Sequence, residues 1–106
     1  MCPYVRVSFQ GMPPDPSIEA AIHRWVARLE AVNLELHRAE VQVERVGRRR
    51  TAVRVGVGPA HGDAPAASAS HADAYVAVSD AFREVHRRLL DHGAKTARRP
   101  TLALAG

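Results

Sequence analysis

Two segments of alternating valines, separated by a short run of glycine and arginines, constrain the fold of this chain most strongly. Residues 39–46 and 51–57 place valines at alternating positions, which is the period of a β-strand with one buried face. The connection Gly47–Arg50 is short enough to join two antiparallel strands directly. The pattern therefore predicts a β-hairpin with arginines at its tip.

Two further segments alternate in the same way. Tyr4–Phe9 places its apolar side chains on one side and its polar ones on the other, and a Gly-Met-Pro-Pro sequence follows it. Ala64–Ser70 is a weaker strand of small residues, in which Ala67 and Ala69 are expected to face inward beneath a helix. Glycine, proline and aspartate in Gly58–Asp63 predict the turn before it. The chain is thus expected to supply four strands.

Apolar residues recur every three or four positions in two segments, which predicts amphipathic helices. The first helix is expected to begin at Pro16 with Asp15 as its N-cap and to end near Asn33. Ser70 and Asp73 fit a capping box at the start of the second, and Gly93 is expected to weaken or stop it. The apolar stripes are Ile18, Ile22, Trp25, Leu29 and Val32 in the first helix, and Tyr75, Val78, Phe82, Val85 and Leu89 in the second.

The order of these elements is β-α-β-β-β-α, which predicts an α+β fold of two layers, with two helices packed on one face of a four-stranded sheet. The first helix should connect two parallel, neighbouring strands. At 106 residues, the chain is expected to form one domain over residues 1–95, followed by a mobile tail at residues 96–106.

Several classes of protein are excluded by what the sequence lacks. No apolar run approaches the roughly 20 residues of a membrane helix, and the single Cys2 cannot form an internal disulfide. A glycine-rich phosphate loop, a nucleophile elbow and a Cys–His pair are missing. The six histidines lack the i, i+4 spacing of helical metal sites. We therefore expect a cytoplasmic protein without cofactor, metal, small-molecule substrate or catalytic activity.

Positive charge is concentrated in two segments. All basic residues except Lys95 are arginines, a side chain suited to bidentate contact with phosphates. Residues 45–54 contain five arginines and no acid, and residues 80–99 contain six bases against three acids. Asp80 and Glu84 could share a helical face as paired carboxylates, but the neighbouring arginines favour surface ion pairs instead. This segregation indicates a nucleic-acid partner, while a merely solvated surface is the alternative.

The segment Asp73-Ala74-Tyr75-Val76-Ala77-Val78, which follows the small-residue strand, resembles the D-x-Y-x-A-[IV] helix start of the ribosome hibernation-promoting factors. These include the ribosome-associated inhibitor A and sigma-54 modulation proteins. The sequence Ala27-Arg28-Leu29-Glu30 is similar to the family's A-K-L-E ending of the first helix. The resemblance spans residues 4–99 and corresponds to the short form of the family.

The resemblance implies a fold like that of double-stranded RNA-binding domains and a function in translation. It implies binding to rRNA in the decoding-site cleft of the small ribosomal subunit, where occupancy would block messenger and transfer RNA without catalysis. A free monomer and a role in the stress response are expected with it. The resemblance points to Arg24, Arg28, Arg83, Arg87, Arg88 and Lys95 as RNA-binding residues, and the charge pattern adds Arg45, Arg48, Arg49 and Arg50. The alternative is a protein-interaction or regulatory module of the same fold that has lost ribosome binding.

Overall fold

The fold was described from a computed structural model, which covers residues 4–32, 36–58 and 65–105 of the chain, with side chains up to residue 91 except that of residue 32. Its elements are β1 (Tyr4–Gln10), α1 (Pro16–Val32), β2 (Arg38–Val46), β3 (Arg50–Gly58), β4 (Ala66–His71) and α2 (Ala74–Ala105). The α+β class and the element order are as expected. Cys2, Asn33 and most of the turn expected before β4 lie outside the described residues.

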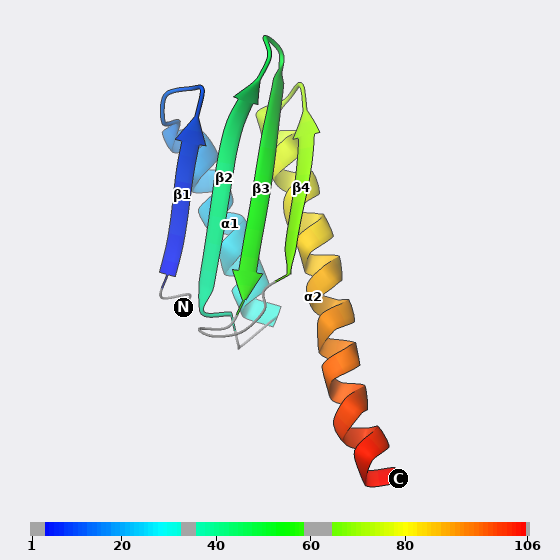
Figure 1. The fold of residues 1–106 in the computed structure, drawn as a ribbon. Coiled ribbons are helices and arrows are strands. Elements are labelled where there is room, and N and C mark those ends of the chain that lie inside the picture. Colours follow the sequence, from blue (N-terminus) through cyan, green and yellow to red (C-terminus); the bar gives the residue numbers. More distant parts are fainter. Residues whose placement is uncertain (1–3, 33–35, 59–64, 106) are drawn as a thin grey trace.

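The sheet is mixed, and its spatial order β1-β2-β3-β4 follows the chain. β1 and β2 are parallel and are joined by α1, whereas β2, β3 and β4 pair antiparallel. Figure 1 shows both helices on one face of the sheet, while the other face carries no helix. The two-layer arrangement is therefore confirmed.

The core lies between the sheet and the helices, and its strand residues form rows across the sheet. Val7, Val41, Val55 and Ala67 are register partners from β1 to β4, and the valines of β2 and β3 in this row are almost fully buried. Small side chains in β4 let α2 approach closely, since Ala77 and Ala81 on the helix are also fully buried. The alanine-rich composition thus has a direct packing role.

The helix starts agree with the sequence in one case and differ in the other. Asp15 caps α1, because its Oδ1 accepts hydrogen bonds from the amides of Ser17 (2.9 Å) and Ile18 (3.3 Å). The capping box expected at Ser70 is wrong. Asp73 is itself the N-cap of α2, with its Oδ1 2.9 Å from the Tyr75 amide, because β4 continues through Ser70 to His71.

The inward face of α2 is rotated from the expected one. Val78, Phe82 and Val85 are fully buried as expected, but Tyr75 is 47% exposed. Burial of Ala77 and Ala81 turns the helix toward β4, because the shortest side chains of the helix lie above the shortest of the sheet. Trp25 is half-buried and packs against the core from its margin.

Two element boundaries also differ from expectation. The hairpin connection is shorter than four residues, because Arg50 pairs with Val46 as the first residue of β3. Gly47 adopts a φ of +69°, which glycine reaches without steric cost. Gly93 does not stop α2, which continues through it to Ala105, since one internal glycine costs a helix only about 1 kcal/mol. The domain boundary at residue 95 stays a prediction.

Candidate nucleic-acid interface

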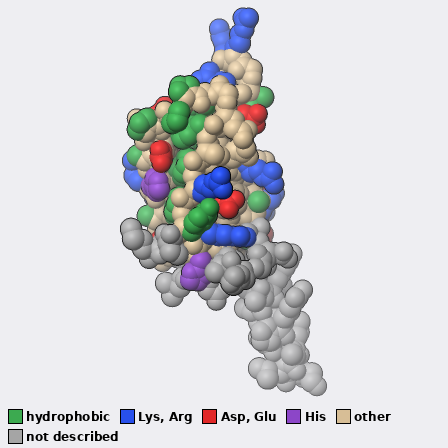
Figure 2. Space-filling model, turned by 60° about the vertical axis from the view of Figure 1, so that its left-hand side comes forward, with side chains coloured by type: hydrophobic (Ala, Val, Ile, Leu, Met, Phe, Trp, Pro, Cys, Tyr) green, Lys and Arg blue, Asp and Glu red, His purple; other side chains and the backbone are tan. Residues whose placement is uncertain are grey.

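The hairpin between β2 and β3 carries four of the expected RNA-binding arginines, and two of them hydrogen-bond within the protein. Arg45 donates from Nη1 to the carbonyl oxygen of Arg48 at 3.3 Å. Arg50 donates from Nη1 to the carbonyl oxygen and the hydroxyl of Ser70, at 3.2 and 3.1 Å. Arg48 and Arg49 are exposed, and their side chains have no partner within the described ranges. Basic side chains project beyond the body of the molecule at this end (Figure 2).

The arginines of α2 are largely neutralised by one acid. The Glu84 carboxylate accepts hydrogen bonds from Nε of Arg87 and from Nε of Arg88, both at 3.2 Å. The hydrogen bond from the Arg87 guanidinium is the main cause that lowers the pKa of Glu84. Arg88 lowers this pKa further, whereas partial desolvation of the carboxylate raises it. Glu84 in turn raises the pKa of Arg87, whose Nη1 also lies 4.0 Å from Asp91. Neither arginine of this cluster is a free cation in the described structure.

Arg88 on α2 also makes a contact with the sheet. Its Nη1 donates to the carbonyl oxygen of Ala66 at the start of β4. The Pro65 carbonyl accepts the amide of Val57 in β3 at 3.1 Å, so by the alternation of a strand the carbonyl of Ala66 points away from β3. The carbonyl of Ser70 has the same parity and is the one bound by Arg50. Two expected RNA-binding arginines therefore satisfy two of the outward carbonyls of β4, those of Ala66 and Ser70.

Between the helices, an aromatic pair carries a third arginine. The Trp25 and Phe82 rings are stacked, with centroids 5.8 Å apart and 13° between their planes. The Arg28 Cζ lies 5.1 Å from the centroid of the Trp25 ring, within the range of a cation–π contact. Trp25 was expected in the apolar stripe of the first helix, and it packs against the core while supporting a surface arginine.

Arg24 on α1 and Arg83 on α2 are exposed and have no side-chain partner in the part of the chain that the structure describes. By helical geometry, Arg83 lies roughly 140° around the axis from the buried Val78, on the solvent side of the helix layer. The side chain of Lys95 lies outside the described residues. Of the expected RNA-binding arginines, those without a hydrogen bond, ion pair or ring contact in the described structure are thus Arg24, Arg48, Arg49 and Arg83.

The expected RNA-binding arginines, paired and unpaired, are distributed over the hairpin end and the helix layer. Arg50 contacts β4 at Ser70 and Arg88 contacts it at Ala66, which separates the two contacts by about 13 Å along the strand. An extended polyanion could follow this distribution, whereas a single phosphate could not span it.

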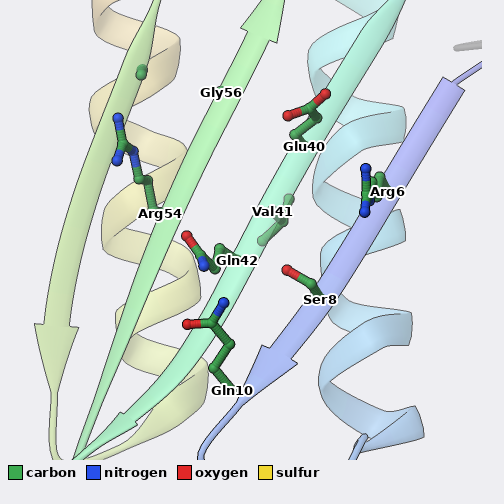
Figure 3. A pocket seen from close by; sticks show the side chains of 9 residues that line it. Arg6, Ser8, Gln10, Glu40, Val41, Gln42, Arg54 and Gly56 are labelled. Atoms are coloured by element: carbon green, nitrogen blue, oxygen red, sulfur yellow. The ribbon is translucent and has the colours of Figure 1, made fainter.

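A second polar surface, on the open face of the sheet, was not expected as a site. Figure 3 shows polar side chains of β1, β2 and β3 around a hollow on this face. The hollow has a volume of about 530 Å³. Gly56 and Ala66 leave it without bulky side chains on one side. Strand alternation in the sequence gave the only signal for this surface, because it places these residues opposite the valines. The hollow is lined by Arg6, Ser8, Gln10, Glu40, Val41, Gln42, Arg54, Gly56 and Ala66.

Within the described residues, no three His, Cys, Asp or Glu side chains come together as a metal site would require. The helices described here also include none that is long and apolar enough to cross a membrane.

A family model described as "Sigma 54 modulation protein / S30EA ribosomal protein" matches residues 5–97. The chain belongs to this family. The match begins in β1 and ends in α2, so it includes every strand and both helices. The family resemblance read from the sequence is therefore confirmed.

Two solved structures share the fold of this S30EA-family chain. A ribosomal subunit interface protein from Coxiella burnetii has a TM-score of 0.76 and 16% identity, covering 86% of this chain and 98% of that one. The N-terminal domain of Protein Y from Thermus thermophilus has a TM-score of 0.69 and 19% identity, covering 78% and 90%. At these identities the likeness is one of fold. No curated protein matches the sequence significantly.

The residues that carried the resemblance to the S30EA family have clear structural positions. Asp73 caps α2, Tyr75 is exposed in its first turn, and Ala77 and Val78 enter the core. The motif thus describes how α2 starts and packs, and it does not by itself mark an RNA contact.

Proposed function

We propose that this protein binds rRNA in the decoding-site cleft of the small ribosomal subunit and blocks messenger and transfer RNA by occupancy. The observation that carries the proposal is membership of the S30EA ribosomal protein family over residues 5–97. The Coxiella protein of the same fold is described as a ribosomal subunit interface protein, which agrees with it. The protein would act in the cytoplasm as a monomer during ribosome hibernation, without catalysis.

The distribution of arginines supports contact with RNA. Arg48 and Arg49 at the hairpin and Arg24 and Arg83 on the helices offer guanidinium groups without internal partners. Phosphate contacts of this kind position a protein on RNA. Arg28, Arg45, Arg50, Arg87, Arg88 and Lys95 belong to the proposed interface as well, in a supporting role for those that bind within the protein.

The exposed apolar side chains are too dispersed to favour a protein-interaction module over an RNA-binding protein. Among the described residues, the large exposed ones are Tyr4, Val46, Tyr75 and Leu90. Tyr75 and Leu90 are separated by about 22 Å along α2, at 1.5 Å per residue. A module that binds a protein partner through an apolar patch would concentrate such residues.

Co-sedimentation with purified small subunits, across a series of salt concentrations, tests the proposal. Four phosphate contacts predict a log–log slope of about −3, so a fourfold rise in salt weakens binding about 60-fold. The variant Arg6→Ala/Arg54→Ala is the matched control, because it removes two exposed arginines from the open sheet face. Binding that is absent at low salt, or that does not change with salt, would contradict the proposal and favour the interaction module.

A further inference from the structure

A cavity lies at the hairpin end of the molecule, where both helices begin. α1 and α2 each start at the end of the sheet from which the β2–β3 hairpin extends (Figure 1). Between their first turns is a cavity of about 560 Å³. It is lined by Met12, Asp15, Ile18, Arg45, Arg49, Thr51, Ala72, Asp73, Ala74 and Tyr75.

The feature that points to ligand binding in this cavity is the hydroxyl group of Thr51. Its side chain is only 4% exposed, and it is the one buried polar residue among those described. Its hydroxyl makes no hydrogen bond to the described part of the protein. Within that part, no fully enclosed side-chain nitrogen or oxygen lacks a partner, so the Thr51 hydroxyl must face the open cavity that Thr51 lines. The accessible hydroxyl can therefore hydrogen-bond to a ligand in the cavity in place of water.

The charges around the cavity favour an anionic group on one side. Arg49 has no partner among the described side chains, and Arg45 uses only Nη1, for the Arg48 carbonyl. The Asp15 and Asp73 carboxylates offset these two cations, but each accepts an amide of its own helix through Oδ1. The N-termini of α1 and α2 add roughly half a positive charge each, which leaves the cavity with a net charge of about +1.

The remaining walls are apolar and aromatic. Met12, Ile18 and Ala74 contribute aliphatic surface, and Tyr75 contributes a ring that is about half exposed. The cavity is much larger than a phosphate group alone requires. Its lining therefore combines arginines for a phosphate, a hydroxyl and carboxylates for hydrogen bonds, and an aromatic wall for a planar ring.

We propose that this cavity binds one nucleotide, with its phosphate at Arg45 and Arg49 and its base against Met12 and Tyr75. The Thr51 hydroxyl hydrogen-bonds to the base or the sugar, and the free carboxylate oxygens accept from exocyclic amino groups of the base. The nucleotide is either a free nucleoside monophosphate or a single residue of an RNA strand that has left its stack. The site shares Arg45 and Arg49 with the proposed ribosome interface, but its occupancy by a free mononucleotide can be measured without a ribosome.

Nuclear magnetic resonance of the full chain tests the site directly. Titration with AMP or CMP should shift the amide signals of Thr51, Ala74 and Tyr75, while inorganic phosphate should bind more weakly. Arg49→Ala should weaken binding about tenfold, and Thr51→Val about fivefold, the effect of one lost hydrogen bond. Thr51→Ser keeps the hydroxyl and should retain binding. Arg54→Ala, which removes a charge from the other face of β3, should bind as the parent does.

A second arm of the experiment separates the two sources of the nucleotide. Shifts with AMP or CMP support a site for free mononucleotides, and shifts that require a short single-stranded RNA support a nucleotide presented by a strand. Equal affinities for AMP and inorganic phosphate would overturn the role of the apolar wall and with it the nucleotide site. Absence of shifts at Thr51, Ala74 and Tyr75 with every probe would overturn the proposal, whatever the ribosome assay shows.

Discussion

The hairpin and α2 each carry three arginines close together, yet the structure leaves them in different states. At the hairpin tip, Arg48 and Arg49 have side chains without an internal partner in the described structure, whereas Arg50 is held by Ser70 and Arg45, on β2, by the Arg48 carbonyl. On α2, Arg87 and Arg88 share the carboxylate of Glu84, and only Arg83 is left available. The local count of basic residues is therefore a poor guide to which of them can meet an anion.

The cause of this difference is the position of acids relative to the arginines. Glu84 lies three and four residues before Arg87 and Arg88, the spacing at which helical side chains meet. The nearest acid before the hairpin arginines is Glu44, whose side chain belongs to the open face of β2. Asp15 and Asp73 line the same cavity as Arg45 and Arg49, but neither forms an ion pair with them in the described structure.

The largest effect is expected from a substitution in the shared hydrophobic core, because unfolding would disrupt both arginine groups. Phe82 is fully buried and stacks on Trp25, so Phe82→Ala should lower the free energy of unfolding by about 3–5 kcal/mol. Thermal or denaturant unfolding measures this loss. Ribosome binding should then fall for both arginine groups together. A variant that unfolds like the parent would show that the two helices do not depend on this packing.

The contrast itself is tested by two double substitutions with the same loss of charge. Arg48→Ala/Arg49→Ala should weaken co-sedimentation with small subunits about 30-fold and flatten the salt slope by about 1.4–1.8 units, the share of two phosphate contacts. Arg87→Ala/Arg88→Ala should cost at most about threefold, because Glu84 already neutralises these side chains. A larger loss for the α2 variant would reverse the assignment of the main contact surface.

Releasing the α2 arginines should reduce the difference between the two regions. Glu84→Gln keeps the size of the side chain and removes its charge, so Arg87 and Arg88 become available to phosphates. Binding to small subunits should strengthen about threefold and its salt slope should steepen. Asp80→Asn removes one charge from the same helix without a pairing role in the described structure, and it should have less effect. Unchanged binding in Glu84→Gln would place α2 outside the RNA contact.

The smallest expected effect is a dependence of stability on pH. The folded-state pKa of Glu84 lies below its ordinary value of 4.5, because Arg87 and Arg88 favour the carboxylate. Its contribution to stability is therefore complete above that ordinary value and is lost as the pH falls through the lowered one. The difference in melting temperature between the parent and Glu84→Gln should shrink in this acidic range. A difference that stays constant down to pH 3 would contradict the pairing.

Much of the fold could be predicted because periodicity reports burial directly. Alternating valines located β2 and β3, and Asp15 located the start of α1. The start of α2 was misplaced because Ser70 and Asp73 both suit an N-cap, and only pairing of β4 with β3 decides between them. The inward face of α2 was rotated because hydrophobicity favoured Tyr75, whereas the space above β4 admits only alanine.

The candidate site was less predictable than the fold. The sequence showed where arginines are concentrated, but which of them have partners within the protein depends on tertiary contacts. The binding of Ser70 by Arg50 and of Ala66 by Arg88 joins residues about twenty positions apart, and no local pattern announces it. Thr51 shares the parity of Val53, Val55 and Val57, so alternation indicates its burial, but nothing in the sequence indicated that its hydroxyl has no internal partner.

The guanidinium contacts on β4 also bear on how this protein behaves at high concentration. An outermost strand exposes a row of unpaired carbonyls and amides, onto which a strand from another molecule can add. Arg50 and Arg88 occupy two of these carbonyls, so an incoming strand would have to displace both side chains before it could pair with β4. The same two arginines thus protect the molecule against self-association through this edge.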